Sequence, residues 1–301
     1  MVLPNNVNIY EVGARDGLQN EYKDIKTDHK IDFINKLSEC GFKFIEATSF
    51  VSPKWIPQMG DNKDVMANIK RRDNVNYPVL TPNLRGLNDA ILAESNIVCV
   101  FATASETFSK KNTNTTISQT LDNAFIVTER ALNKGLKVRG YISCVLGCPY
   151  EGKISFNETA QIAKKLIDMG CYEVSLGDTV GFGTPIETKQ MIEAVIKHVE
   201  VKKLAAHFHD TYGQALANLY VALELGVATI DSSIGGLGGC PYAEGAKGNV
   251  ATEDVLYMLK GMGIHTGIDL NKVIKVSWHI NKILGREPNS RVALALKRNN
   301  I

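Results

Sequence analysis

The chain has 301 residues, of which 44% are hydrophobic and 22% charged, and its formal net charge is +2. This balance is typical of a globular protein with a sizeable core and gives no reason to expect nucleic acid or a membrane as a partner. No uninterrupted apolar run approaches the roughly 20 residues of a transmembrane helix. Six scattered cysteines are too sparse for a disulfide scaffold. We therefore expect a cytoplasmic protein whose cysteines are thiols.

One local pattern recurs along the chain: a helical stretch ends at a glycine, and a run rich in β-formers follows. Glycine suits the left-handed residue that ends a helix, and it takes this place at Gly41, Gly135, Gly170 and Gly226. Eight βα units in a chain of this length favour an α/β fold of the closed (β/α)8 type, the TIM barrel, over an open sheet. The strands are predicted at 7–12, 43–49, 76–81, 97–103, 137–144, 172–177, 203–209 and 228–234.

The alternation of strands and helices stops near residue 264. We predict that residues 1–263 form the barrel and that residues 264–301 form a C-terminal helical extension packed on it. Helices are expected over 270–284 and 292–297. No stretch rich in Pro, Gly or Ser precedes the extension, so no flexible linker is predicted.

Two histidines share one face of the predicted strand 203–209. His207 and His209 are two positions apart, so both side chains leave the strand on the same side, while Leu204, Ala206 and Phe208 form an apolar stripe on the other. Taken alone, this spacing is more typical of paired core histidines than of metal ligands.

The other predicted strands also carry one polar face, which predicts a polar lumen. Such a lumen is either a mutually hydrogen-bonded network or an active site, which barrels place at the C-terminal ends of their strands. We favour the active site. The polar side chains on this face, besides the two histidines, are Arg139, Tyr141, Ser143, Glu173, Ser175, Asp231 and Ser233.

Three further positions have the chemistry of a site. The first strand runs into Arg15 and Asp16, although Asp16 precedes a glycine and is also a turn former. Glu46 lies inside the second strand, where a buried carboxylate must be paired or protonated, and Arg15 is its candidate partner. Asn249 precedes a predicted helix and is either its N-cap or a metal ligand. Two imidazoles, a carboxylate and an amide oxygen would suit a hard or borderline divalent ion.

A glycine-rich stretch at 235–249 follows the eighth strand and contains Cys240. Glycines permit sharp bends and close approaches, so a mobile loop over the site is expected. The spacing does not match the phosphate-binding P-loop, and no nucleotide site is predicted. The segment 239–245 echoes 147–152, and the sequence chemistry alone does not choose between Cys240 and Cys148 as a reactive thiol.

Seven segments carry longer motifs: 11–21, 49–55, 77–83, 139–152, 175–179, 207–218 and 236–254. Together they resemble the 3-hydroxy-3-methylglutaryl-CoA (HMG-CoA) lyase family of metal-dependent barrels, from about residue 7 to about residue 270. The chain departs from the family pattern at Ala14, where proline is usual, and at Gly235, where alanine is common. Neither change removes a functional group.

The resemblance implies cleavage of HMG-CoA to acetyl-CoA and acetoacetate with Mg²⁺ or Mn²⁺, in a pathway of the leucine-degradation or ketone-body type. An acyl-CoA would be the small-molecule partner, and a homodimer is expected. The implied metal ligands are Asp16, His207, His209 and Asn249. The implied lining of the acyl pocket is Arg15, Gln19, Tyr141, Ser175, Asp178 and Thr179.

The resemblance also implies roles in the reaction. It selects Cys240 over Cys148 as the thiol that protonates C2 of the product. Arg15 would stabilise the thioester enolate that forms. The base that removes the hydroxyl proton stays open among Glu46, Asp16 and His207.

Two alternatives compete with the lyase. One is a related barrel aldolase or acyl-CoA condensing enzyme that acts on a 2-ketoacid, against which the Cys240 loop argues. The other is a non-catalytic acyl-CoA-binding barrel, and replacement of Cys240 would separate it from an enzyme.

Overall fold

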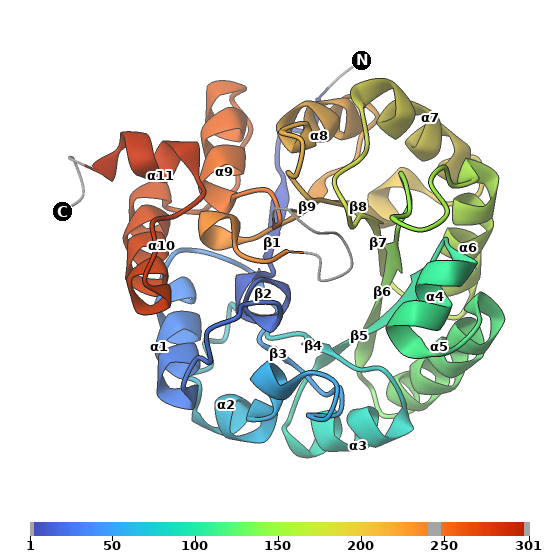
Figure 1. The fold of residues 1–301 in the computed structure, drawn as a ribbon, viewed down its shortest axis with the longest axis horizontal. Coiled ribbons are helices and arrows are strands. Elements are labelled where there is room, and N and C mark those ends of the chain that lie inside the picture. Colours follow the sequence, from blue (N-terminus) through green and yellow to red (C-terminus); the bar gives the residue numbers. More distant parts are fainter. Residues whose placement is uncertain (1–2, 240–247, 298–301) are drawn as a thin grey trace.

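The predicted barrel is present in the computed structural model, which describes residues 3–239 and 248–297 (Figure 1). Within these residues, nine strands form one sheet in the order β2-β1-β9-β8-β7-β6-β5-β4-β3. All of its neighbouring pairs are parallel. The strands are β1 (Asn8–Glu11), β2 (Phe44–Ile45), β3 (Thr48–Ser49), β4 (Val79–Leu80), β5 (Ile97–Thr103), β6 (Lys137–Ser143), β7 (Glu173–Asp178), β8 (Leu204–Phe208) and β9 (Thr229–Ser232).

The sheet closes because its two edge strands are pieces of one segment, 44–49. β2 pairs with β1, and β3 pairs with β4. Between them, the amide of Glu46 donates to the carbonyl of Glu11 and the amide of Ala47 to the carbonyl of Pro78, each at 2.9 Å. The segment changes partner in its middle, which is why the strand predicted at 43–49 is observed as two short ones.

The other predicted strands lie within two residues of their expected bounds, with one exception. The strand expected at 76–81 is reduced to Val79–Leu80. Pro78 lies inside the expected range and has no N–H to donate to a ladder. Proline therefore shortens this strand, although the chain still follows the barrel wall.

Helices surround the barrel (Figure 1). Several begin at a residue whose side chain accepts a first-turn amide, as at Asn83, Ser105 and Ser155. The glycines expected to end helices have φ between 77° and 109°: Gly41, Gly135, Gly170 and Gly226. In the described ranges, no helix is both long and apolar enough to cross a membrane. The helices are α1 (Thr27–Leu37), α2 (Asn62–Asn68), α3 (Leu84–Leu92), α4 (Glu106–Thr113), α5 (Ile117–Leu132), α6 (Phe156–Asp168), α7 (Pro185–Val195), α8 (Ala215–Glu224), α9 (Thr252–Gly261), α10 (Leu270–Leu284) and α11 (Arg291–Ala295).

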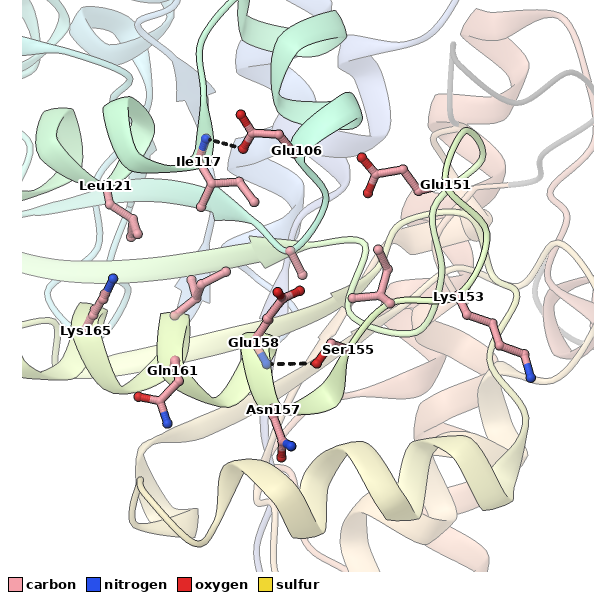
Figure 2. A pocket seen from close by; sticks show the side chains of 13 residues that line it. Glu106, Ile117, Leu121, Glu151, Lys153, Ser155, Asn157, Glu158, Gln161 and Lys165 are labelled. Carbon is pink, nitrogen blue, oxygen red and sulfur yellow. Dashed lines mark hydrogen bonds between the residues drawn. The ribbon is translucent and has the colours of Figure 1, made fainter.

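A surface cavity of about 520 Å³ lies among α4, α5 and α6 (Figure 2). Buried Leu121 and Ile162 form part of its apolar lining, and Glu158 and Lys165 add opposite charges. None of its lining residues belongs to the polar set predicted for the lumen. The cavity is therefore a feature of the helical layer, separate from the barrel interior.

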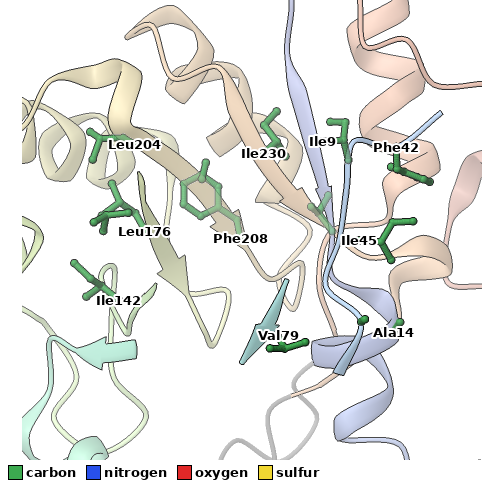
Figure 3. Close-up of a cluster of buried hydrophobic side chains, with 14 of the residues drawn as sticks. Ile9, Ala14, Phe42, Ile45, Val79, Ile142, Leu176, Leu204, Phe208 and Ile230 are labelled. Atoms are coloured by element: carbon green, nitrogen blue, oxygen red, sulfur yellow. The ribbon is translucent and has the colours of Figure 1, made fainter. Parts of the chain in front are cut away.

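The main hydrophobic core lies between the sheet and the helices (Figure 3). Leu204, Ala206 and Phe208 of β8 belong to it, at most 1% exposed. Ile230 and Leu176 continue the core on the neighbouring strands. The predicted outward apolar stripe is confirmed, and the alternate side chains of β8 face the lumen.

The C-terminal helices pack against other helices of the outer layer. α10 matches the expected range 270–284 and contacts α1, α9 and a short turn at Ile234–Gly236. α11 is observed at Arg291–Ala295 and contacts α9 and α10. Asp254 of α9 accepts a hydrogen bond at 2.7 Å from the hydroxyl of Ser290, the N-cap residue of α11, which ties α9 to α11.

Candidate metal centre and active site

Asp16, His207 and His209 converge at the C-terminal mouth of the barrel. Nε2 of His207 lies 3.9 Å from Asp16 Oδ2, and Nε2 of His209 lies 3.8 Å from the same oxygen. One ligand atom from each residue can be chosen so that all lie within 4.8 Å of one another. These separations are longer than hydrogen bonds. The three side chains form a candidate metal site.

Asn249 joins this cluster through both its backbone and its side chain. Its backbone forms a β-bridge with His209, and its Nδ2 donates to Asp16 Oδ2 at 2.8 Å. Its Oδ1 is buried and makes no hydrogen bond within the described structure, a costly state for a carbonyl oxygen. The N-cap alternative is wrong, because α9 begins at Thr252 and its N-cap is Ala251. The nitrogen and oxygen donors of this cluster fit a divalent cation.

Asp16 lies in a single π-helical turn, Gly13–Gly17. Such turns are rare and are often found at functional sites. A Cβ built on Gly17 would lie 2.8 Å from Ser233 Oγ and 2.9 Å from Leu237 Cβ. The turn therefore lies directly against the chain that follows β9, and only glycine allows this approach. Asp16 is both a turn residue and a member of the cluster.

Arg15, in the same turn, bridges two carboxylates. It donates to Asp16 Oδ1 at 2.7 Å and to Glu46 Oε2 at 2.8 Å, so the expected pair with Glu46 is confirmed. The Tyr141 hydroxyl also donates to Glu46 Oε2, at 3.1 Å. Burial raises the pKa of Glu46, although Arg15 opposes the shift. Burial also acts to raise the pKa of Asp16, but Arg15 and the two histidines outweigh it and hold that pKa well below its usual value.

A second polar layer lies deeper in the lumen, around Arg139, whose side chain is fully buried. Its guanidinium donates twice to Asp231, at 2.7 and 3.0 Å, and once to Glu173, at 2.7 Å. It also lies 3.9 Å from the ring centroid of Tyr10. Burial acts to raise the pKa of Asp231, but Arg139 and His207 outweigh it and lower that pKa to about 2. This layer is a satisfied ionic network.

Asp231 also connects the two layers. Its Oδ2 lies 3.3 Å from Nδ1 of His207, on the side of the ring opposite Asp16. A carboxylate at Nδ1 sets the tautomer and leaves Nε2 as the ligand atom. Strand parity predicts that Asp231 faces the lumen but indicates no role for it. Only the register between β8 and β9, which pairs His207 with Asp231, brings the two residues together.

The expected acyl-pocket residues occupy different surroundings. Ser175 donates to Asp231 Oδ2 at 2.7 Å and so belongs to the deeper layer. Tyr141 stands between the layers, 5.5 Å from Arg15 and 5.0 Å from Arg139, measured from each guanidinium to its ring centroid. Gln19 is half-buried two residues after the π-helical turn, and its Oε1 makes no hydrogen bond within the described structure.

Asp178 and Thr179 are tied to backbone groups beyond β7. The carboxylate of Asp178 accepts the amides of Gly181, Phe182 and Gly183 at 2.8–3.1 Å. Burial raises its pKa to about 6. The Thr179 hydroxyl accepts the amide of Cys144 at 3.0 Å. Both side chains therefore shape the loops at the barrel mouth.

Cys240 lies outside the described residues, which stop at Gly239 and resume at Gly248. A Cβ built on Gly248 would lie 2.5 Å from the carbonyl oxygen of Gly238, so the two described ends meet closely. The carbonyl of Gly239 accepts a hydrogen bond from Asn20 Nδ2 at 3.1 Å. The chain that leads to Cys240 thus departs beside the segment that carries Asp16.

The competing thiol, Cys148, is 1% exposed. Its sulfur accepts hydrogen bonds from the Ser105 hydroxyl at 3.0 Å and from the Tyr150 amide at 3.4 Å. It opens a tight turn that closes through a backbone bridge to Gly152. These contacts indicate that Cys148 stabilises the turn. It is a free thiol, as are Cys40, Cys99 and Cys171.

A closed barrel with an aspartate and two histidines clustered at the C-terminal mouth defines a metal-dependent TIM-barrel enzyme. Comparison with known families gives the particular family. The model of the HMGL-like family matches residues 6–280, and the chain belongs to this family.

Individual relatives cover nearly the whole chain. It is 54% identical over 292 residues to mitochondrial hydroxymethylglutaryl-CoA lyase of Bos taurus, covering 97% of this chain and 90% of that protein. The crystal structure of hydroxymethylglutaryl-CoA lyase from Pseudomonas aeruginosa matches with a TM-score of 0.97 and 51% identity, over 99% of this chain and 100% of the other. An HMG-CoA lyase from Acinetobacter baumannii in complex with coenzyme A and 3-methylmalate matches with a TM-score of 0.93 and 37% identity. The match covers 98% of this chain and 96% of the other.

Proposed function

We propose that this chain is a carbon–carbon lyase that cleaves HMG-CoA to acetyl-CoA and acetoacetate. The observation that carries the proposal is the cluster of Asp16, His207 and His209 with Arg15 beside it. The names of relatives above 50% identity give the same reaction class. The relative bound to coenzyme A supports an acyl-CoA as the substrate.

The metal ion is proposed to be Mg²⁺ or Mn²⁺, held by Asp16, His207, His209 and Asn249. The buried, unsatisfied Oδ1 of Asn249 and the unprotonated Nε2 of His207 that Asp231 favours support this ligand set. Both ions accept mixed oxygen and nitrogen ligands with open positions. When bound, the ion supplies Lewis-acid polarisation of substrate oxygens.

The reaction begins when a base takes the proton of the C3 hydroxyl. Of the three candidates, Asp16 has a lowered pKa, which makes it a weak base. His207 is held at Nδ1 by Asp231, and its Nε2 would be given to the metal. Glu46 has a raised pKa and one carboxylate oxygen without a hydrogen bond in the described structure. We therefore assign the base to Glu46, with His207 as a ligand that also faces the reacting hydroxyl.

As the C2–C3 bond breaks, its electron pair passes to the thioester and forms the enolate of acetyl-CoA, while C3 becomes the ketone of acetoacetate. Arg15 stabilises the developing negative charge, because it is a fixed cation at the barrel mouth. Cys240 then donates its proton to C2. The proton that Glu46 took from the hydroxyl is released, and the thiolate of Cys240 takes one up, which restores both groups for the next cycle. The acyl pocket is formed by Gln19 and Tyr141, with Ser175, Asp178 and Thr179 holding its walls.

We also propose a homodimer in the cytoplasm, with no nucleic acid or membrane as partner. The buried thiols Cys40, Cys99 and Cys171 support a reducing compartment. Analytical ultracentrifugation tests the dimer: a single species of monomer mass at micromolar concentration would contradict it.

Product analysis tests the reaction. The purified chain is incubated with HMG-CoA and Mg²⁺ or Mn²⁺, and acetoacetate is measured. Acetoacetate release that stops on rigorous chelation and returns with the metal supports the lyase. Release of product only from a 2-ketoacid substrate would support the related aldolase, and ligand binding without turnover of either substrate would support a binding protein.

The thiol assignment is tested with two matched variants. Cys240→Ala is expected to abolish turnover while HMG-CoA binding largely survives, because only the proton donor is lost. Cys148→Ala is the control, and it should keep its turnover while losing some stability with the Ser105 hydrogen bond. Equal turnover in both variants would contradict the role of Cys240.

A further inference from the structure

Glu11 is a buried carboxylate that the proposed chemistry does not use. It ends β1, is 0% exposed and touches three separate parts of the mouth. Its Oε1 accepts the amide of Gly13 at 2.8 Å and the amide of Ile234 at 3.0 Å. Its Oε2 accepts the hydroxyl of Thr252 at 2.6 Å. One side chain therefore joins the start of the turn that holds Asp16, the chain after β9, and the first residue of α9.

These three contacts surround the candidate metal site. Gly13 opens the turn that carries Arg15 and Asp16, and Thr252 follows Asn249 by three residues. β1 and β9 pair side by side in the barrel wall (Figure 1). Glu11 at the end of β1 therefore reaches the amide of Ile234 just beyond β9. The two segments that carry Asp16 and Asn249 are thus both bonded to one carboxylate, although 233 positions separate these two residues in the chain.

A second buried glutamate bonds to Gly235, the residue after Ile234. Glu253 is 0% exposed, and both of its oxygens accept the amide of Gly235, at 2.9 and 3.1 Å. Gly235 has φ of 64°, and a Cβ there would lie 2.5 Å from Asn281 Nδ2 of α10. The turn Ile234–Gly236 is therefore clamped between α9 and α10, and the C-terminal helix supports it from outside.

Burying the carboxyls of Glu11 and Glu253 costs free energy, which indicates that their hydrogen bonds have a role in this part of the structure. A buried carboxyl in an apolar barrel wall is unfavourable unless hydrogen-bonded, and burial raises the pKa of Glu11 to about 8 and that of Glu253 to about 7. Neither residue has a cationic partner among the described ion pairs. Their bonds go instead to the backbone and hydroxyl groups that flank the metal site.

We propose that Glu11 is a positioning residue for the reaction: it sets the distance between the Asp16 turn and the chain that carries Asn249 and leads to Cys240. Glu253 holds the segment after β9 through its bonds to the amide of Gly235. This inference rests on the proposed lyase function, and it concerns geometry, since Glu11 touches neither the metal ligands nor the site of the substrate.

The test compares Glu11→Ala with Glu11→Gln. Glutamine keeps an oxygen for the two amides and can donate its amide to the Thr252 hydroxyl, whereas alanine removes all three contacts. Glu11→Ala is expected to weaken Mn²⁺ binding by about 10-fold to 100-fold and to lower kcat about 100-fold with little change in KM for HMG-CoA. Glu11→Gln should stay within about threefold of the unmodified chain in both measurements.

Asp61→Ala is the matched control for lost stability. Asp61 accepts the buried Lys30 ammonium at 2.9 Å, where the start of α2 meets α1. Its described bonds go to Thr27 and Lys30 and not to the metal cluster, so its loss should lower stability and leave kcat unchanged. The proposal is overturned if Glu11→Ala keeps normal Mn²⁺ affinity, if glutamine fails to rescue it, or if the Asp61 variant loses as much kcat at equal stability. Mn²⁺ calorimetry separates this from the function itself: a chain that does not cleave HMG-CoA but loses Mn²⁺ affinity on Glu11→Ala refutes the lyase and keeps the positioning role.

Discussion

The two polar layers of the barrel lumen each contain an arginine, an aspartate and a glutamate but differ in how their polar groups are satisfied. In the deeper layer, Arg139 is bonded to Asp231 and Glu173 at 2.7–3.0 Å, and its cation leaves no carboxylate of that layer unpaired. At the mouth, both histidines stand 3.8–3.9 Å from Asp16, and Asn249 Oδ1 has no hydrogen bond in the described structure. The deeper layer is complete in itself, whereas the mouth layer is arranged for something further.

The comparison resolves the two readings of a polar lumen. A buried ionic network and an active site were alternatives at the level of strand parity, and the structure shows the network with a candidate metal cluster above it. The network supports the site: Asp231 is held by Arg139 and in turn holds His207. We therefore expect mutations in the deeper layer to act first on stability and those at the mouth to act first on metal binding and turnover.

The largest expected effect comes from Asp16→Ala at the mouth. It should abolish tight Mn²⁺ binding and lower kcat/KM by about 1,000-fold or more, because the carboxylate ligand of the cluster is gone. Arg15 keeps its pair with Glu46, so the free energy of unfolding should change by less than about 1 kcal/mol. Calorimetry with Mn²⁺ and urea unfolding measure the two quantities. Normal Mn²⁺ affinity in this variant would remove Asp16 from the metal site.

Arg139→Met, in the deeper layer, should do the reverse. It leaves Asp231 and Glu173 buried without their cation, which is expected to lower the free energy of unfolding by about 3 to 5 kcal/mol. Urea unfolding measures the loss. Arg139→Lys is the control, and its single ammonium should recover only part of the stability. An unchanged unfolding midpoint in the methionine variant would show that the layer is not a stability element.

Asp231→Asn tests the link between the layers. An amide keeps the shape but weakens the hold on Nδ1 of His207, so Mn²⁺ affinity should fall by about 10-fold to 100-fold. Ser175→Ala is a useful comparison, because it removes a different bond to the same carboxylate oxygen and leaves the histidine contact in place. If both variants bind Mn²⁺ as the unmodified chain does, the two layers are independent.

The smallest effect, counted for one pH unit, is a pH dependence at Glu11. Burial raises its pKa from 4.5 to about 8, so the folded chain holds this proton more tightly than the unfolded chain does. The stabilisation is complete below the unfolded value and is lost as the pH rises through the folded value. Relative to Glu11→Gln, the unmodified chain should lose about 1.4 kcal/mol of unfolding free energy for each pH unit within this window. Parallel stability curves for the two chains from pH 5 to pH 8 would contradict the shift.

Features that depend on a few neighbouring residues could be predicted from the sequence. The pairing of His207 with His209 on one face follows from the twofold period of a strand, and the glycines that end helices follow from the steric freedom at positive φ. One pair between distant positions, Arg15 with Glu46, was also expected, because a mid-strand carboxylate needs a cation, and it is present at 2.8 Å. The C-terminal helix at 270–284 follows from the hydrophobic periodicity of that segment.

Features that depend on the closed barrel could not be predicted. The sequence allowed Asn249 to be an N-cap, and only the observed helix start at Thr252 removes that alternative. The break in 43–49 arises because one segment must pair with β1 and with β4 to close the sheet. The positions of Asp231 behind His207 and of Glu11 among three mouth segments had no local signal.

The sequence by itself therefore determined the repeating βα units, the polar face of each strand and the residue types available at the mouth, because these are set by contacts within a few positions of the chain. The tertiary structure decided which of those residues meet. Contacts such as Asp16 with His207, or Glu11 with Ile234, join positions about 200 residues apart. They depend on the register of every strand between them, and that register is fixed only when the whole barrel closes.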